Sequence, residues 1–555
     1  MNTSSQSTLN TRLLYILIVV LLIGAFCLRI PLIKDRYFDP DELEHIQVAS
    51  LISHGWVPHK DFFEHHNHLF HLFLLPLFLL NDQVELLFTA RIIMQALVVI
   101  VIGLIYLLGK KLYSPLVGGV AALWPAFNYT FLVKTIEIRP DTPAMIFFLL
   151  AVLILLSAIR RGRIGLWLLA GFSFALALLC TQKIIFPILG VTVYLAGFWI
   201  QQAWINQRDD RRQILLQVAS IGGGFLLPIG LFLLYFLRED ALSSLIRENI
   251  LINLNWQHRF SPLLFLRMIA FFNPYFIFWS GIGAVCAPLI NHRWRIRTKG
   301  ISLPYLALLG GILGAIISPV AYSQYYVLIM PVSAIYASVA IIWFISRLWR
   351  SDFRRRLLVG ILLVLPIILP IYIKYYCNYK YDLPLEDINF WLIFSGGAIT
   401  AAYLLSLFSP RRIGKYLTII FLLAASLIRP INLFVHCYPY TNHVFLKYLK
   451  VIREATGSDD RVMDGWTGLG TFRFPAYYYI FLHYGVICNL TPEEKGEKLV
   501  KALEDNQPAI IVKDDSFYHL PPEISAYIER HYYIIEEGTL RGIPIRIYKR
   551  KDFGE

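Results

Sequence analysis

The chain has 555 residues, of which 57% are hydrophobic and 16% are Asp, Glu, Lys or Arg. This composition leaves too little polar surface for a water-soluble protein of this length and predicts a polytopic membrane protein. The formal net charge of +14 does not indicate nucleic-acid binding, because the basic residues stand in short connectors between apolar runs. We therefore expect contact with membrane lipid and no nucleic-acid partner.

Apolar runs of about 20 residues, enough for a helix to cross a bilayer, recur along most of the chain. The first is too long for a signal-peptide core and is interpreted as a retained anchor. The fold class predicted is an all-α membrane protein with thirteen spans. The expected spans are residues 11–33, 84–108, 115–133, 142–159, 165–182, 185–204, 214–236, 263–289, 301–318, 327–346, 357–374, 389–408 and 416–436.

Basic clusters stand in alternate connectors, which the positive-inside rule places in the cytoplasm. They predict a cytoplasmic amino terminus and an extracytoplasmic carboxyl-terminal segment, in a plasma membrane or bacterial inner membrane. The clusters begin at Lys110, Arg160, Arg208, Arg293, Arg347 and Arg411.

Residues 437–555 have the composition of a soluble protein, so the chain is divided into a transmembrane module, 1–436, and an extracytoplasmic α/β domain. A disulfide between Cys437 and Cys488 is one option for an exported domain. The local signals are a helix capped by Asn442 and running to Gly457, a capping box at Thr491–Glu494, and strands at 509–512 and 543–548.

The first outer loop, residues 34–81, is densely ionisable, which a plain connector between spans does not require. Apolar residues from Asp41 to Ser53 recur at helical spacing and predict a helix on the membrane surface with one face in lipid. Asp41 would stand at its amino-terminal end, where the helix dipole favours a carboxylate. Asp39 and Asp41 could equally serve only as caps.

Seven of the fourteen histidines lie between His45 and His71, which makes a divalent metal the one cofactor to consider. The candidate ligands are Asp41, Glu64, His65 and His68. The spacing matches no established zinc motif, so histidines that only form hydrogen bonds are the alternative. No Gly-rich phosphate loop precedes a cytoplasmic helix, which disfavours a nucleotide-sugar donor.

Three segments, in this order, resemble a known family: Asp41-Glu42 after the first span, Asp61 to His66, and Arg139-Pro140-Asp141. Over residues 10 to 350 they are similar to the GT-C integral-membrane glycosyltransferases. More narrowly, they resemble the dolichyl-phosphate-mannose-protein mannosyltransferase and lipid A aminoarabinose transferase superfamily, including the Rgt-like bacterial transferases. The resemblance implies a many-helix fold, an extracytoplasmic active site, a sugar donor on undecaprenyl or dolichyl phosphate, and inversion at the anomeric carbon.

The resemblance assigns the family's essential carboxylate to Asp41, followed by Glu42, and places two further acidic positions at Glu64 and Asp141. A carboxylate that accepts the proton of the acceptor hydroxyl suffices for single displacement, and Asp41 is the expected base. The chain departs from the family pattern in two places. His65, His66 and Asn67 follow Glu64 where a basic residue and prolines are usual, and Glu44 replaces an arginine.

A cation should stabilise the departing phosphate. Lys183 is the expected group, with Arg139 and Arg259 assisting; a lysine that only snorkels to the interface is the alternative. His65, Tyr325 and Tyr326 are expected to line the acceptor or lipid-donor cavity, although the tyrosines also suit an interfacial aromatic belt.

The expected function is that of an inverting hexosyl- or pentosyltransferase of cell-envelope glycan synthesis. It would move a sugar from a polyprenyl-phosphate donor to an extracytoplasmic lipid, glycan or protein acceptor. The leading alternative is a transporter or flippase, but transporters place polar residues near the bilayer midplane in two related halves. A membrane scaffold is a third reading and leaves the acidic loop unexplained.

Overall fold

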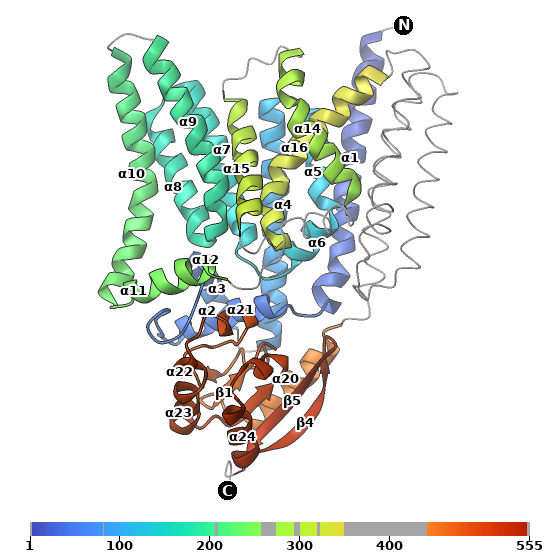
Figure 1. The fold of residues 1–555 in the computed structure, drawn as a ribbon. Helices are drawn as coiled ribbons and strands as arrows, with labels where there is room; N and C mark the ends of the chain where they lie inside the picture. Colours follow the sequence, from blue (N-terminus) through green and yellow to red (C-terminus); the bar gives the residue numbers. More distant parts are fainter. Residues whose placement is uncertain are drawn as a thin grey trace, which may run out of the picture.

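The computed structural model describes residues 3–80, 83–205, 209–256, 273–293, 300–318, 322–348 and 441–551. The three last predicted spans, Arg259 and Cys437 lie outside these ranges. So do Arg208, the part of the basic cluster from Arg347 that begins at Arg350, and the cluster that begins at Arg411. The described chain forms a helical part and a carboxyl-terminal domain beneath it (Figure 1).

The helical part contains long apolar helices that run roughly parallel to one another (Figure 1). Its α-helices are α1 (Thr3–Asp35), α2 (Pro40–Ser53), α3 (Leu69–Leu74), α4 (Gln83–Leu112), α5 (Pro115–Ala126), α6 (Tyr129–Ile136), α7 (Asp141–Arg161), α8 (Ile164–Cys180), α9 (Ile185–Ile205), α10 (Asp209–Arg238), α11 (Leu242–Leu245), α12 (Ile252–Leu254), α14 (Pro274–Arg293), α15 (Ser302–Ile317) and α16 (Ser323–Leu348). Two 3-10 turns, Leu75–Leu79 and Gln182–Ile184, and a π-helix, Ile246–Leu251, join some of them.

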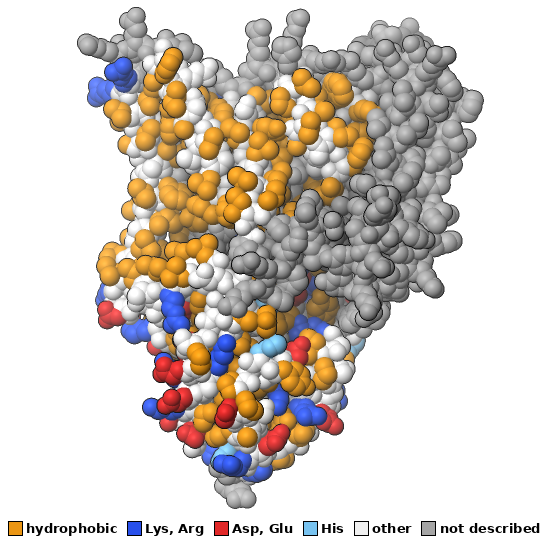
Figure 2. Space-filling model, in the orientation of Figure 1, with side chains coloured by type: hydrophobic (Ala, Val, Ile, Leu, Met, Phe, Trp, Pro, Cys, Tyr) orange, Lys and Arg blue, Asp and Glu red, His pale blue; other side chains and the backbone are white. Residues whose placement is uncertain are grey.

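Among the described residues, six helices are long and apolar enough to cross a membrane: α1, α4, α7, α9, α10 and α16. Helices α8, α14 and α15 are apolar and shorter, and each coincides with an expected span. The chain is thus a multi-pass membrane protein, while the number thirteen stays a prediction. Apolar side chains cover the helical part, and charged ones gather on the carboxyl-terminal domain (Figure 2).

The expected span 115–133 is two helices, α5 and α6, which meet at an angle of 67°. Asn128 causes the break, because its side chain accepts a hydrogen bond from the backbone of Phe131 and starts a new helix. The bend turns α6 away from the direction of α5 and so sets where the following segment, residues 137–141, begins.

Close helix packing depends on glycine. A Cβ atom on Gly171 of α8 would lie 2.0 Å from the backbone oxygen of Ile221 in α10, and one on Gly224 of α10 would lie 2.1 Å from that of Leu168. Small residues allow backbones to approach in this way inside a membrane, where no hydrophobic force drives helices together.

The carboxyl-terminal domain contains a five-stranded sheet in the order β2-β1-β3-β5-β4. Strand β1 is parallel to β2 and β3, whereas β5 is antiparallel to β3 and β4. Arg541 and Gly542, both with positive φ, form the tight β4–β5 turn. The elements are α20 (His443–Ala455), β1 (Arg461–Asp464), β2 (Phe474–Pro475), α21 (Tyr484–Ile487), α22 (Pro492–Lys495), α23 (Glu497–Asn506), β3 (Ile510–Lys513), α24 (Pro522–His531), β4 (Tyr532–Leu540) and β5 (Ile543–Arg550).

The sequence signals in this domain are largely confirmed. Thr491 and Glu494 form the predicted capping box, and β3 and β5 cover the predicted strands. Asn442 precedes α20 as expected but does not cap it with its side chain, which donates instead to the backbone oxygen of Lys34 at the end of α1. Cys488 is a free thiol.

Helix α2 is buried between the helical part and the carboxyl-terminal domain (Figure 1). Leu43 meets Gly468, where an added Cβ would lie 2.2 Å from its side chain, and Val48 and Leu51 share a core with Met463. The expectation that one face of this helix lies in lipid is therefore wrong. Its apolar residues pack against protein on more than one side, which helical spacing alone does not distinguish from packing against lipid.

Candidate active site beside helix α2

Local sequence fixes the start of α2. The Asp39 side chain accepts a hydrogen bond from the backbone of Asp41, the Glu42 side chain accepts one from the backbone of Asp39, and Pro40 occupies the first turn. Asp39 is therefore the cap, and Asp41 is free for another contact. Asp41 remains 31% exposed at its side chain, whereas Glu42 is fully buried.

Glu42 is held on all sides by protein. Arg91 of α4 donates two hydrogen bonds to its carboxylate, at 2.9 and 2.7 Å, and the backbone of Ile138 donates a third at 3.1 Å. Arg91 also donates to backbone oxygens at the end of α1 and the start of the loop, on Ile33, Arg36 and Tyr37. Glu42 and Arg91 thus join α1, α2 and α4, and the geometry favours a positioning role for Glu42.

Asp41 is paired with Arg139, whose guanidinium donates to its carboxylate. The neighbouring Glu137 accepts from three cations: Arg36 at 2.7 Å, Lys134 at 2.9 Å and Arg139 at 2.5 Å.

Burial acts to raise the pKa of Asp41, but Arg139 and Lys134 outweigh it and hold that pKa below its usual range. Asp41 is therefore an ionised carboxylate near neutral pH, as a proton acceptor must be.

Asp141 and Lys183 face each other across the starts of α7 and α9, with 3.9 Å between their charged atoms. Asp141 is buried, and neither of its oxygens accepts a hydrogen bond from the described residues. The ammonium of Lys183 lies 5.4 Å from the ring centre of Tyr325. Tyr326 is buried in the apolar core of the helical part. The pair leaves both charges under-coordinated, which suits a site that takes a charged ligand.

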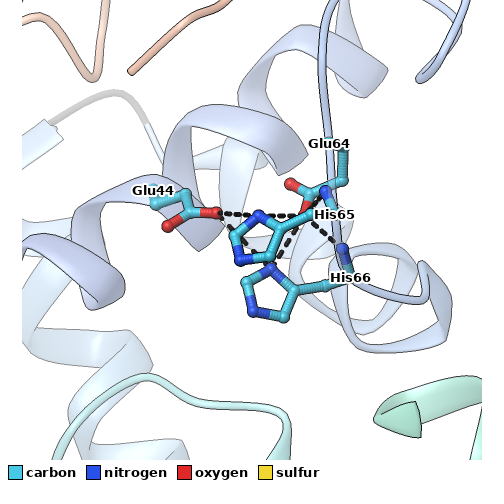
Figure 3. Close-up of side chains that lie close together, drawn as sticks. All are labelled: Glu44, Glu64, His65 and His66. Atoms are coloured by element: carbon cyan, nitrogen blue, oxygen red, sulfur yellow. Dashed lines mark hydrogen bonds and ion pairs between the residues drawn. The ribbon is translucent and has the colours of Figure 1, made fainter. Parts of the chain in front are cut away.

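A second cluster lies on the next turn of α2. Glu44 points from the helix toward Glu64, His65 and His66 of the following loop (Figure 3). One ligand atom from each of the four lies within 4.8 Å of the others. Of the expected metal ligands, this cluster includes Glu64 and His65. Asp41 is paired with Arg139 instead, and His68 is hydrogen-bonded to His59.

Without a metal ion, bound protons balance the charge of this cluster. Burial, together with the nearby Glu64, raises the pKa of Glu44 to about 8. Burial acts to lower the pKa of His66, but the facing carboxyl groups of Glu44 and Glu64 outweigh this and raise it to about 9. Without a metal ion, the cluster is an imidazolium between one carboxylate and one protonated carboxyl group.

Four further histidines form a buried chain from α2 to the π-helix. Their facing ring nitrogens lie 3.0 Å apart between His45 and His71, 3.4 Å between His71 and His68, and 2.9 Å between His68 and His59. His59 ends the chain at Glu248, 2.8 Å away. Each neutral imidazole has one N–H donor and one nitrogen acceptor. When every ring donates to the next group in the direction of Glu248, each of these four contacts has one donor and one acceptor. Burial lowers the pKa of His45 and of His68 well below the usual range, in keeping with that neutral state.

Solved structures similar in fold to this chain include membrane glycosyltransferases. The chain matches ArnT from Cupriavidus metallidurans bound to undecaprenyl phosphate with a TM-score of 0.62, over 95% of this chain and 97% of that one. The two are 13% identical. The chain has the GT-C fold.

Two other comparisons agree with this GT-C assignment. Residues 71–236 match the family described as dolichyl-phosphate-mannose-protein mannosyltransferase. The oligosaccharyltransferase AglB from Archaeoglobus fulgidus, in complex with an inhibitory peptide and a dolichol-phosphate, matches with a TM-score of 0.51 at 13% identity, over 97% of this chain and 74% of that one. No curated protein matches the chain in sequence. The resemblance inferred from the sequence is confirmed.

Within this GT-C fold, the structure brings the predicted site residues together in three groups. Asp41 joins Arg139, Asp141 joins Lys183 and Tyr325, and Glu64 joins His65. Sequence reasoning did not single out Arg36, Arg91, Lys134 and Glu137 as site residues. A charged residue inside an apolar run, as Arg91 is, was the available signal, because such residues are costly and face the protein interior.

Proposed function

We propose that the protein is an inverting glycosyltransferase that moves a sugar from a polyprenyl-phosphate donor to an extracytoplasmic acceptor. The observation that carries the proposal is the position of Asp41. In its ion-pair network it is a partly exposed, ionised carboxylate, while Glu42 and Glu137 are fully closed off. The GT-C fold supports the same conclusion, since similar structures hold undecaprenyl phosphate or dolichol-phosphate.

In the proposed reaction, Asp41 accepts the proton of the acceptor hydroxyl as its oxygen attacks the anomeric carbon of the donor sugar. The bond between that carbon and the phosphate oxygen breaks, and the electron pair leaves with the phosphate. A phosphate leaving group needs no proton, so one carboxylate suffices. Attack opposite the leaving group inverts the anomeric centre.

Lys183 is proposed to hold the donor phosphate. Its ammonium lies 3.9 Å from the carboxylate of Asp141, too far for a good hydrogen bond, so it can donate an N–H hydrogen bond to a phosphate oxygen. Arg139 is already shared between Asp41 and Glu137, and its proposed role is to orient Asp41. Arg259 stays a proposed assistant, with Tyr325 beside the phosphate and Tyr326 and His65 nearer the acceptor or lipid chain.

The proposed location is an inner or plasma membrane, with residues 437–555 outside. Helices α4 and α7 support this orientation, because their basic ends, at Lys111 and Arg161, lie away from the carboxyl-terminal domain (Figure 1). The transporter alternative is weaker, because the ionisable groups described above gather at one end of the helical part rather than midway along it.

The decisive experiment is transfer by purified Asp41→Asn protein, given polyprenyl-phosphate sugars and candidate acceptors. Asn keeps the shape of Asp and cannot take a proton, so transfer should fall by about 10²–10⁴. Asp61→Asn is the matched control, since Asp61 is an exposed carboxylate of the same loop. Full activity of Asp41→Asn would remove Asp41 from the mechanism. Mass spectrometry of lipid-linked sugars in cells lacking the gene would identify the donor that accumulates.

A further inference from the structure

The cluster of Glu44, Glu64, His65 and His66 has the geometry of a metal site. A tetrahedral zinc ion with ligands at about 2.0–2.1 Å places those ligand atoms about 3.3 Å apart. The Nδ1 atom of His66 lies 3.4 Å from Oε1 of Glu44, and Nδ1 of His65 lies 3.6 Å from the same oxygen. These separations are too long for good hydrogen bonds and close to the edge of such a tetrahedron.

The two distances from Glu64 to the imidazoles lie on either side of the separation of about 3.3 Å expected between zinc ligands. Its Oε1 atom lies 3.9 Å from Nδ1 of His65 and 2.8 Å from Nδ1 of His66. The shorter one is a hydrogen bond that would open by about half an ångström to admit an ion of this size.

Three buried atoms at this point lack a hydrogen-bond partner among the described residues. They are Oε1 of Glu44, Oε2 of Glu64 and Nδ1 of His65. Glu44 is 4% exposed and points into the cluster from α2 (Figure 3). Buried polar atoms are normally satisfied, so Oε1 of Glu44 and Nδ1 of His65, which lie 3.6 Å apart, indicate a missing partner that they share. Oε1 of Glu64 faces the same point and already accepts hydrogen bonds from the backbone of His65 and His66. A cation would satisfy them together.

The charges of the cluster indicate a divalent ion. Within the described parts of the chain, Glu44 and Glu64 make ion-pair contacts with His65 and His66 and with no lysine or arginine. Two carboxylates and two neutral imidazoles carry a charge of −2, which one divalent cation balances. A mixed set of two nitrogens and two oxygens suits Zn²⁺ better than Mg²⁺ or Ca²⁺, which prefer oxygen.

We propose that Glu44, Glu64, His65 and His66 bind one divalent transition-metal ion of the Zn²⁺ class, and that the ion fastens the loop 59–68 to helix α2. Four protein ligands complete a tetrahedron and leave no open position for a reacting water, so the ion is structural. Glu44 lies three residues after Asp41 in α2. Because the ion ties Glu44 to the loop 59–68, it also restrains the first turn of α2, which carries Asp41. The proposal does not depend on the transfer reaction.

Metal binding can be measured on the whole protein, purified in detergent with a histidine-free tag and stripped with a chelator. We expect equilibrium dialysis against Zn²⁺ to give one tightly bound ion per chain, retained in excess Mg²⁺. The Co²⁺-loaded protein should show the visible absorption of a tetrahedral site, and Zn²⁺ should raise the thermal midpoint of unfolding.

The variants Glu44→Gln and His65→Gln, made separately, should each weaken Zn²⁺ binding at least tenfold and abolish the tetrahedral spectrum. His519→Gln is the control, because His519 is exposed on the carboxyl-terminal domain. The proposal is overturned if the parent protein binds no Zn²⁺, or if both variants bind it as tightly as the parent. Because no sugar donor is present, these outcomes are separate from the result for Asp41→Asn.

Discussion

Two groups of buried charge lie on successive turns of helix α2 and are balanced in different ways. In the first, four carboxylates meet four permanent cations: Asp39, Asp41, Glu42 and Glu137 with Arg36, Arg91, Lys134 and Arg139. In the second, the charged partners of Glu44 and Glu64 among the described residues are imidazoles. The first group, the ion-pair network, is complete as it stands. The second, the Glu–His cluster, depends on protons or on an added ion.

The ion-pair network and the Glu–His cluster suit different tasks because the partners of their carboxylates differ. A guanidinium stays charged at any physiological pH and forms paired hydrogen bonds with a carboxylate, so it fixes geometry permanently. An imidazole changes charge near neutral pH and is also a common metal ligand. In the two proposals made above, arginine fixes the position of Asp41 and histidine attaches the loop to α2.

The largest effect is expected from breaking the ion-pair network at Arg91. Arg91→Leu removes both guanidinium hydrogen bonds to the buried Glu42 and leaves Arg36, 3.9 Å away, to balance its charge. Breaking a buried ion pair in this way costs about 3–5 kcal/mol of stability. The measurement is thermal unfolding and the folded fraction in detergent. Arg453→Leu, on the exposed face of α20, should change stability by no more than about 0.5 kcal/mol. Equal stability of Arg91→Leu and the parent would show that the network does not hold α2.

The next largest effect is expected at Lys183. Like the cations of the ion-pair network, it is a permanent cation beside a carboxylate, but its 3.9 Å contact with Asp141 leaves room for a further partner, as in the Glu–His cluster. A charge-assisted hydrogen bond is worth about 1.5–3 kcal/mol, so Lys183→Ala should weaken use of the polyprenyl-phosphate donor about ten- to a hundredfold. Kinetics at varied donor concentration test this. Lys60→Ala is the control, since Lys60 is half-exposed and pairs with Glu239. Unchanged donor dependence would make Lys183 a snorkelling lysine.

The smallest effect is expected where an ion pair is open to solvent. Arg247, 48% exposed, pairs at 2.9 Å with Glu494 of the carboxyl-terminal domain. Glu494→Gln should therefore cost only about 1 kcal/mol. The exposed neighbour Glu493→Gln is the control.

The same pair predicts a pH dependence. Burial acts to raise the pKa of Glu494, but a backbone hydrogen bond from Thr491 and contacts with Arg247 and Tyr479 outweigh it and lower the pKa to about 2. Its contribution to stability is thus present above about pH 4.5 and is lost as the pH falls toward 2. The thermal midpoint should fall less steeply over this range in Glu494→Gln. An identical pH profile would contradict the assignment.

Sequence alone predicted the features that depend on local pattern. Apolar runs predicted the helices, and the residues around Thr491 predicted a capping box. Both features are formed by residues that are close together in the chain. The order of acidic and basic motifs gave the fold family.

Features that join distant residues were not predictable in this way. Asp41 and Arg139 are far apart in the chain, and Glu44 gave no sign of which residues it would face. Burial of α2 was missed because its partners, such as Gly468, come from the other end of the sequence. Periodicity tells which residues avoid water but not what covers them.

The end of α1 is completed by the last part of the chain. The backbone of Asn442 donates to Asp35, its side chain donates to Lys34, and Thr441 pairs with Arg36. These partners are synthesised some 400 residues after the carbonyl groups they satisfy. During synthesis, the end of α1 therefore stays open until the carboxyl-terminal domain has been made. A chain truncated before residue 441 would leave α2 uncovered as well, so the arrangement around Asp41 depends on a domain that is synthesised last.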